Sequence, residues 1–137
     1  YGEAFTLLRY VIDRDIDGLK QQGYQVFRPA VFFITDGEPT DDQTWEQTYR
    51  ALIDKTTNRR APNVIAFGVN GANAATIGKI GTVGAFIASS GINPGNALKE
   101  ILRSLTNSIV SSSSSSSPQL VVPAAPDGCT AVPLQTV

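Results

Sequence analysis

The stretch VFFITDGEPTDD, residues 31–42, joins an apolar run to an acidic turn. With Ala30 before it, the run has five consecutive apolar residues rich in β-branched and aromatic side chains. This pattern is too short for a helix and is typical of a strand covered on both faces, as in parallel sheets. Asp36 follows the strand, and four carboxylates fall within seven residues. The stretch therefore predicts a buried strand that ends in acidic groups.

Helical and strand patterns alternate on both sides of this strand. Apolar residues at spacings of three and four predict four helices, over residues 1–23, 41–56, 74–80 and 93–110. Buried-strand patterns recur at 63–69 and 85–89. Regular alternation of this kind implies right-handed crossovers and a mainly parallel sheet with helices on both faces. The predicted fold class is α/β, a Rossmann-like three-layer α/β/α arrangement.

The alternation ends at seven consecutive serines, residues 111–117. Serine runs bury too little surface to offset chain entropy, so we expect a flexible linker there. Residues 118–137 are rich in proline, which predicts an extended tail that attaches, if at all, through the apolar residues 120–122. The expected organisation is a domain over 1–110, a linker over 111–117 and a tail over 118–137.

The composition is that of one soluble globular domain, with 137 residues, 42% hydrophobic content and a formal net charge of -1. This charge balance gives no electrostatic reason to expect nucleic acid or an anionic membrane as a partner. A single cysteine, Cys129, cannot form an intrachain disulfide, which fits the cytoplasm. The lack of histidine excludes Ser-His-Asp and Cys-His catalysis. The lack of methionine predicts that further residues precede Tyr1.

Asp36 is the candidate metal ligand, because open parallel sheets bind ligands at the carboxyl ends of their strands. We expect Gly37 to take a positive φ, so that the Asp36 carboxylate projects above the sheet edge. Oxygen donors from Asp36, Thr35 and Thr40, in a loop that includes Glu38, suit a hard divalent cation: Mg²⁺, Mn²⁺ or Ca²⁺. The alternative is an ordinary loop, since Asp, Gly and Pro are common loop residues.

The remaining charged and aromatic residues have simpler interpretations. Asp41 and Asp42 are expected to cap the helix that follows them. Trp45 and Tyr49 lie on one helical stripe and are predicted to be core residues. The Arg59–Arg60 pair is predicted to be a solvated helix end.

The sequence RPAVFFITDGEPTDD, residues 28–42, resembles the third metal-site motif of von Willebrand factor type A (VWA) domains, in which a buried strand ends in Thr-Asp-Gly. The Arg-Pro before the strand, VIAFGV at 64–69 and PDG at 126–128 are similar to bacterial VWA proteins of the tellurium-resistance type. The resemblance covers about residues 1–128. It implies a Rossmann-like fold and a metal ion-dependent adhesion site (MIDAS) with Asp36 as one ligand.

Two other parts of that family's metal site do not occur in the chain. They are a first-strand Asp-x-Ser-x-Ser motif and a Thr in a second loop. YGEAF, residues 1–5, resembles the helix start just after that Thr, so residues 1–110 match the C-terminal part of a VWA domain. The resemblance implies that an upstream half of the domain supplies the missing ligands. That half, or another chain, would also cover the sheet edge.

The resemblance implies a metal-dependent protein-binding module in bacterial stress response or signalling, not an enzyme. Its cation would accept an acidic side chain from a protein partner. The alternative is a Mg²⁺-dependent Rossmann-like enzyme that uses Asp36 on a phosphorylated substrate. The glycine-rich residues 68–84 match neither a phosphate loop nor Gly-x-Gly-x-x-Gly, and we interpret them as a loop and a short helix.

Overall fold

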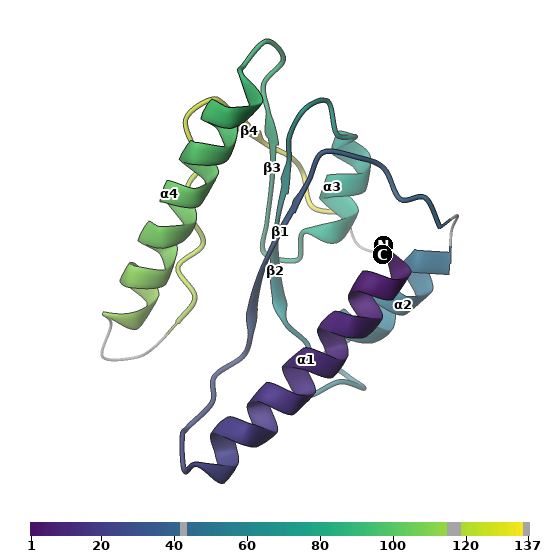
Figure 1. The fold of residues 1–137 in the computed structure, drawn as a ribbon, viewed down its shortest axis with the longest axis vertical. Helices are drawn as coiled ribbons and strands as arrows, with labels where there is room; N and C mark the ends of the chain where they lie inside the picture. Colours follow the sequence, from purple (N-terminus) through teal and green to yellow (C-terminus); the bar gives the residue numbers. More distant parts are fainter. Residues whose placement is uncertain (42–43, 115–118, 136–137) are drawn as a thin grey trace. The chain divides into compact units, whose positions relative to one another are not determined.

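The computed structural model describes residues 1–41, 44–114 and 119–135 (Figure 1). Its elements, in chain order, are α1 (Gly2–Gln21), β1 (Ala30–Thr35), α2 (Thr44–Ile53), β2 (Asn63–Gly68), α3 (Ala74–Ile80), β3 (Gly84–Ala88), α4 (Pro94–Ser113) and β4 (Cys129–Ala131). They form two compact units. We call Tyr1–Pro29 with Pro39–Asn63 the helical unit, and Ala30–Glu38 with Val64–Val137 the sheet unit.

The helical unit is built on an aromatic cluster shared by α1 and α2. Phe5 of α1 is 2% exposed, and its ring centroid lies 4.7 Å from that of Tyr49 and 6.2 Å from that of Trp45. Trp45 and Tyr49 are both buried, which confirms their prediction as core residues. Large aromatic side chains contribute most of the buried apolar area in a small core, so these rings account for much of the packing between α1 and α2.

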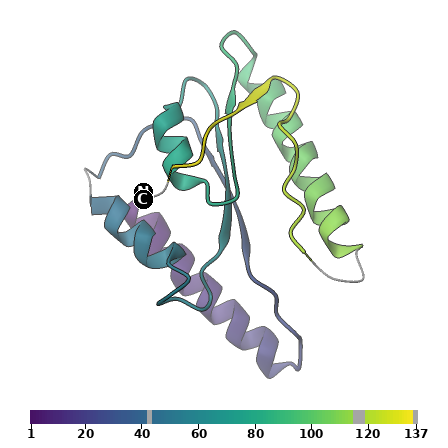
Figure 2. The same cartoon turned by 180° about the vertical axis from the view of Figure 1, so that it is seen from behind.

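The sheet unit contains a four-stranded, mostly parallel sheet in the order β1-β2-β3-β4 (Figures 1 and 2). β2 and β3 are parallel, with Phe67 opposite Phe86. The Thr35 carbonyl at the end of β1 accepts a 2.9 Å hydrogen bond from the Val69 N–H just after β2, so these two strands also run in one direction. β4 is antiparallel to β3. The α/β class and the positions of the predicted strands are thereby confirmed. The expectation that β1 is buried on both faces is wrong, because Ala30 is exposed and the other five residues of β1 are only partly buried.

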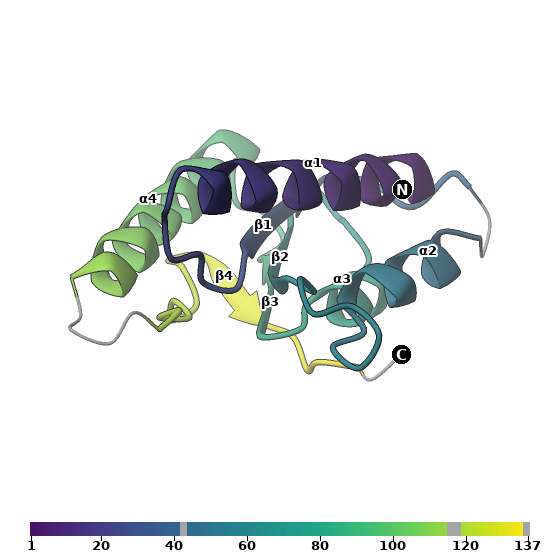
Figure 3. The same ribbon diagram turned by 90° about the horizontal axis from the view of Figure 1, so that it is seen from below.

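Helices α3 and α4 lie on opposite faces of the sheet, as Figure 3 shows end-on. Ile101 of α4 packs into one cluster with Ile65, Phe67 and Phe86. On the other face, a Cβ placed on Gly68 would come within 2.9 Å of Ile77 of α3. Alternate residues of β2 thus face different helices, as the period of two in a strand requires.

The apolar residues of α4 are not all buried. Their spacing of three and four puts Leu98, Leu102 and Ile109 on the same stripe of the helix as Ile101, but these three are 40%, 49% and 51% exposed. The buried face instead contains Ala97, Ile101 and Ser108. Small residues on this face let the helix approach the sheet closely, and the larger side chains are left on the outside.

Helix α4 continues beyond its expected end at Val110, as far as Ser113. In this last part of the helix, Ser112 donates a 2.6 Å hydrogen bond to the Ser108 carbonyl, and Ser113 donates one of 2.9 Å to the Ile109 carbonyl. Such bonds to the carbonyl one turn earlier use the helix's own acceptors. The rest of the expected linker, residues 115–117, lies outside the described residues.

The tail was expected to be extended, but part of it forms β4 of the sheet, and the tail contacts both faces of the sheet unit (Figure 2). Leu120 packs against the apolar cluster on the α4 side, as expected. Val121 accepts a hydrogen bond from the Ser108 hydroxyl through its carbonyl and donates one of 2.9 Å to the Ser112 hydroxyl through its N–H. Further on, the Gln135 N–H donates a 2.9 Å bond to the Gly78 carbonyl of α3.

Candidate site at the carboxyl end of the sheet

Polar loops follow the carboxyl ends of the three parallel strands. Asp36 comes directly after β1, and Ser89 comes directly after β3. Asn70 is the second residue after β2. Asn70 has a φ of 52°, in the left-handed region that asparagine tolerates better than most residues. Parallel strands present their carboxyl ends at one edge of the sheet, so these loops form the edge where ligands usually bind in open α/β folds.

Asp36 is exposed, and its carboxylate makes no hydrogen bond or ion pair with another residue of the described ranges. The backbone beneath it is fixed, because the Thr35 carbonyl before it bonds to Val69. The Thr35 hydroxyl closes the turn: it accepts from the Gly37 N–H and donates to the Gly37 carbonyl, each at 3.2 Å. A rigid strand end thus presents one accessible carboxylate.

The expectation that Gly37 needs a positive φ is wrong. The glycines with positive φ in the described residues are Gly23, Gly71, Gly91 and Gly128. At Gly37 a Cβ would meet no atom within 4 Å. The hydroxyl of Thr35 performs the turn closure that we assigned to glycine's conformational freedom.

Glu38 is bound to the start of α3. Its Oε1 accepts a 3.0 Å hydrogen bond from the Asn73 N–H, and its Oε2 accepts one of 2.9 Å from the Thr76 hydroxyl. Asn73 in turn caps α3 by accepting from the Ala75 and Thr76 N–H groups. Glu38 therefore stabilises a helix start, where acidic groups are favoured, instead of simply forming part of the Asp36 loop.

Asp41 has a different partner from the one we predicted. Its carboxylate accepts hydrogen bonds from the main-chain nitrogen of Tyr1, at 2.9 Å, and from the Gly2 N–H. It therefore caps the start of α1, and among the described residues its carboxylate makes no hydrogen bond to α2. The Gly2 hydrogen bond is the largest cause that lowers the pKa of Asp41 below its ordinary value. Thr40, the other predicted oxygen donor, is exposed and belongs to the helical unit, as Asp41 does. Asp42, the other predicted cap, lies outside the described residues.

The donor set at Asp36 fits a hard cation in kind but not in number. Among the described residues, no three His, Cys, Asp or Glu side chains come together as a metal-binding group. Mg²⁺ and Ca²⁺ take six or more oxygen ligands, of which water can supply several. Asp36 with the Thr35 hydroxyl thus offers the beginning of a site, and further protein ligands would have to complete it.

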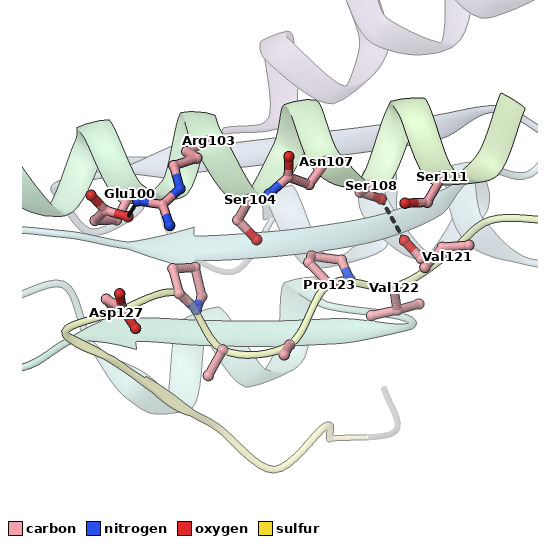
Figure 4. A pocket seen from close by; sticks show the side chains of 13 residues that line it. Glu100, Arg103, Ser104, Asn107, Ser108, Ser111, Val121, Val122, Pro123 and Asp127 are labelled. Atoms are coloured by element: carbon pink, nitrogen blue, oxygen red, sulfur yellow. Dashed lines mark hydrogen bonds and ion pairs between the residues drawn. The ribbon is translucent and has the colours of Figure 1, made fainter. Parts of the chain in front are cut away.

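A second candidate is a groove of about 290 Å³ between α4 and the tail (Figure 4). Its charged residues are Glu100 and Arg103, which form a 3.1 Å ion pair, and Asp127. The groove was missed in the sequence because it depends on the return of the tail, which we treated as separate from the domain. Its remaining walls are Ser104, Asn107, Ser108, Ser111 and residues 121–126.

The groove has a polar wall on α4 and a largely apolar wall on the tail, and its polar side chains do not form a catalytic arrangement. Ser108 is 2% exposed, and its hydroxyl is used in the bond to the Val121 carbonyl seen in Figure 4. The volume is at the lower limit of the roughly 300–1,000 Å³ typical of small-molecule pockets. The arrangement mainly explains how the tail is held, and it gives no reaction.

No family model, curated protein or solved structure matches the chain. In the part of the chain that the structure describes, no helix is both long and apolar enough to cross a membrane.

Proposed function

We propose that this chain forms part of a metal-dependent protein-binding module of the VWA type, with Asp36 as a ligand of the cation. The observation that carries the proposal is the contrast between neighbouring acids. Glu38 and Asp41 are both used as helix caps, whereas the Asp36 carboxylate has no bonding partner among the described residues. It also lies where a parallel sheet normally holds its ligand.

The order of the strands supports this proposal. β1 is the outermost strand of the described sheet on one side, although it carries the candidate ligand. The resemblance to VWA domains implies that another strand, which carries the Asp-x-Ser-x-Ser motif, lies in the middle of the sheet. A strand paired beside β1 would bring its serine and aspartate side chains to the same edge as Asp36.

The chemistry proposed for the site is recognition, without a reaction. A bound Mg²⁺ or Mn²⁺ with few carboxylate ligands keeps a net positive charge and attracts an acidic side chain of a protein partner. The role of this chain is to hold one carboxylate at a fixed place, with Thr35 closing the turn beneath it. The resemblance further places the module in the bacterial cytoplasm, in stress response of the tellurium-resistance type.

Calorimetric titration of the full-length native protein with Mn²⁺ tests the proposal. Asp36→Asn should weaken Mn²⁺ binding by at least about tenfold, equivalent to ~1.4 kcal/mol. Glu38→Gln is the matched control, because it removes the same charge two residues away from a side chain that is used as a cap. Equal Mn²⁺ affinity in the Asp36→Asn and Glu38→Gln proteins would remove Asp36 from the metal site.

A further inference from the structure

A cavity of about 150 Å³ in the helical unit is lined by four cationic side chains, those of Lys20, Arg28, Arg59 and Arg60. We call it the basic cavity. The whole chain has 11 lysines and arginines and a net charge of -1, so this local gathering is not a reflection of the composition. The apolar wall of the cavity is formed by Ile16, Val26, Phe27 and Pro29.

Two of the four cations are held in place by the protein. Arg60 donates to the Asp17 carboxylate at 2.5 and 3.1 Å, and to the Asp13 carboxylate at 3.2 Å. The hydrogen bond to Asp17 is the largest cause that raises the pKa of Arg60. Arg28 donates a 2.5 Å hydrogen bond to the Ala61 carbonyl. A guanidinium fixed in this way loses little further freedom when it binds a ligand. Because Arg60 bonds to Asp13 and Asp17, the prediction that it is part of a solvated helix end is wrong.

The other two cations are not held by hydrogen bonds among the described residues, although the Arg60 hydrogen bond and the charge of Lys20 both help to lower the pKa of Asp17. The side chains of Lys20 and Arg59 are exposed and make no hydrogen bond or ion pair with another residue of the described ranges. Asp13 and Asp17 bond to Arg60, and neither lines the cavity. Four positive charges with two nearby carboxylates leave an excess of positive charge at the cavity. Such a concave, positively charged surface attracts anions.

We propose that the basic cavity binds the phosphate group of a small phosphate monoester whose substituent is apolar. A dianionic group with several oxygens can accept from guanidinium and ammonium donors together, which a single carboxylate does less completely. The cavity is smaller than a typical drug-sized pocket, so it fits an anionic group with few atoms. Phe27 is 51% exposed at the cavity and provides an apolar surface for the substituent. This proposal does not depend on the metal site.

Binding of phenyl phosphate to the full-length native protein, measured by calorimetry, tests the proposal. Benzoate is the matched ligand, because it presents the same ring on a carboxylate with a single charge. Phenyl phosphate should bind saturably and more tightly than benzoate. Its affinity should also rise with pH through its second pKa, about 6, as the dianion forms.

Variants locate the site. Lys20→Gln and Arg59→Gln should each weaken phenyl phosphate binding by roughly fivefold, as expected for one charged hydrogen bond at a partly exposed site. Within the described ranges neither side chain makes a hydrogen bond or ion pair, so both proteins should keep the thermal unfolding of the wild type. Arg9 lies on α1, as Lys20 does, but it does not line the cavity. Arg9→Gln therefore removes an equal charge and should change the affinity for phenyl phosphate less than twofold.

Four results would overturn the proposal. The first is no saturable binding of phenyl phosphate. The second is equal binding of benzoate, which would mean that the cavity does not select phosphate. The third is an equal loss of affinity in Arg9→Gln and Arg59→Gln, which would show binding to the overall charge. Tighter binding of a short phosphoserine peptide than of phenyl phosphate would contradict the assignment to small molecules.

Discussion

Replacing Glu38 with alanine should loosen α3, although Glu38 lies 35 residues before the N–H group that it binds. The substitution removes the acceptors for the Asn73 N–H and the Thr76 hydroxyl. Asp36→Ala is the natural comparison. It removes the neighbouring acid in the same loop, whose carboxylate has no bonding partner among the described residues.

The expected cost follows from the geometry of the two hydrogen bonds. At 3.0 and 2.9 Å both have good lengths, and hydrogen bonds to charged groups are worth roughly 1.5–3 kcal/mol when buried. Both bonds are exposed, so the lower range of helix capping applies, about 1 kcal/mol in total. Asp36→Ala should cost close to zero. Glu38→Gln should be intermediate, because its amide oxygen can still accept from Asn73.

Amide hydrogen exchange in α3 measures this effect locally. A helix of seven residues is unstable alone, so a loss of about 1 kcal/mol should speed exchange at Ile77 and Ile80 by roughly fivefold. Trp45, the single tryptophan, lies in the helical unit, and its fluorescence provides an internal control that should not change. Unchanged exchange in Glu38→Ala, or equal acceleration in Asp36→Ala, would refute the assigned roles of these two acids.

Two other perturbations test how each unit is held together. Ser108→Ala leaves the Val121 carbonyl without its buried donor, so the sheet unit should lose about 1 kcal/mol of unfolding free energy in urea, and an unchanged midpoint would contradict the attachment. The Arg60 hydrogen bond lowers the pKa of Asp17 below its ordinary 3.8, so its stabilisation is present above pH 3.8 and is lost as the pH falls through the lowered pKa. Trp45 fluorescence in urea should therefore show Asp17→Asn less stable than the wild type at pH 7, and the difference should disappear in acid.

The elements with strong local patterns could be predicted from the sequence. The run before Asp36 forms β1, and Asn93 with Pro94 marks the start of α4. The apolar periodicity correctly identified α1, α2 and the other parallel strands. Local periodicity reports which residues are helical or extended, and this signal is strong where the segment is long and buried on one face.

The partners of the polar residues could not be predicted in the same way. Asp41 binds Gly2 across 39 residues and Arg60 binds Asp17 across 43, and nothing in the local sequence encodes such pairs. The short strand β4 has only three residues, so its own pattern is too weak to identify. Its place is decided by pairing with β3, which is a tertiary effect.

The attachment of the tail changes what a cut in the chain would do. Residues 119–135 bond to α4 through Val121, to β3 through β4 and to α3 through Gln135, so they contact the sheet unit at three separated places. A protease that cuts within the serine run would separate the polypeptide without separating the fold. The two fragments would run as two bands on a denaturing gel and together as one particle in gel filtration. In that sense the covalent connection increases the local concentration of the tail, while the affinity resides in the non-covalent contacts of the tail with α4, β3 and α3.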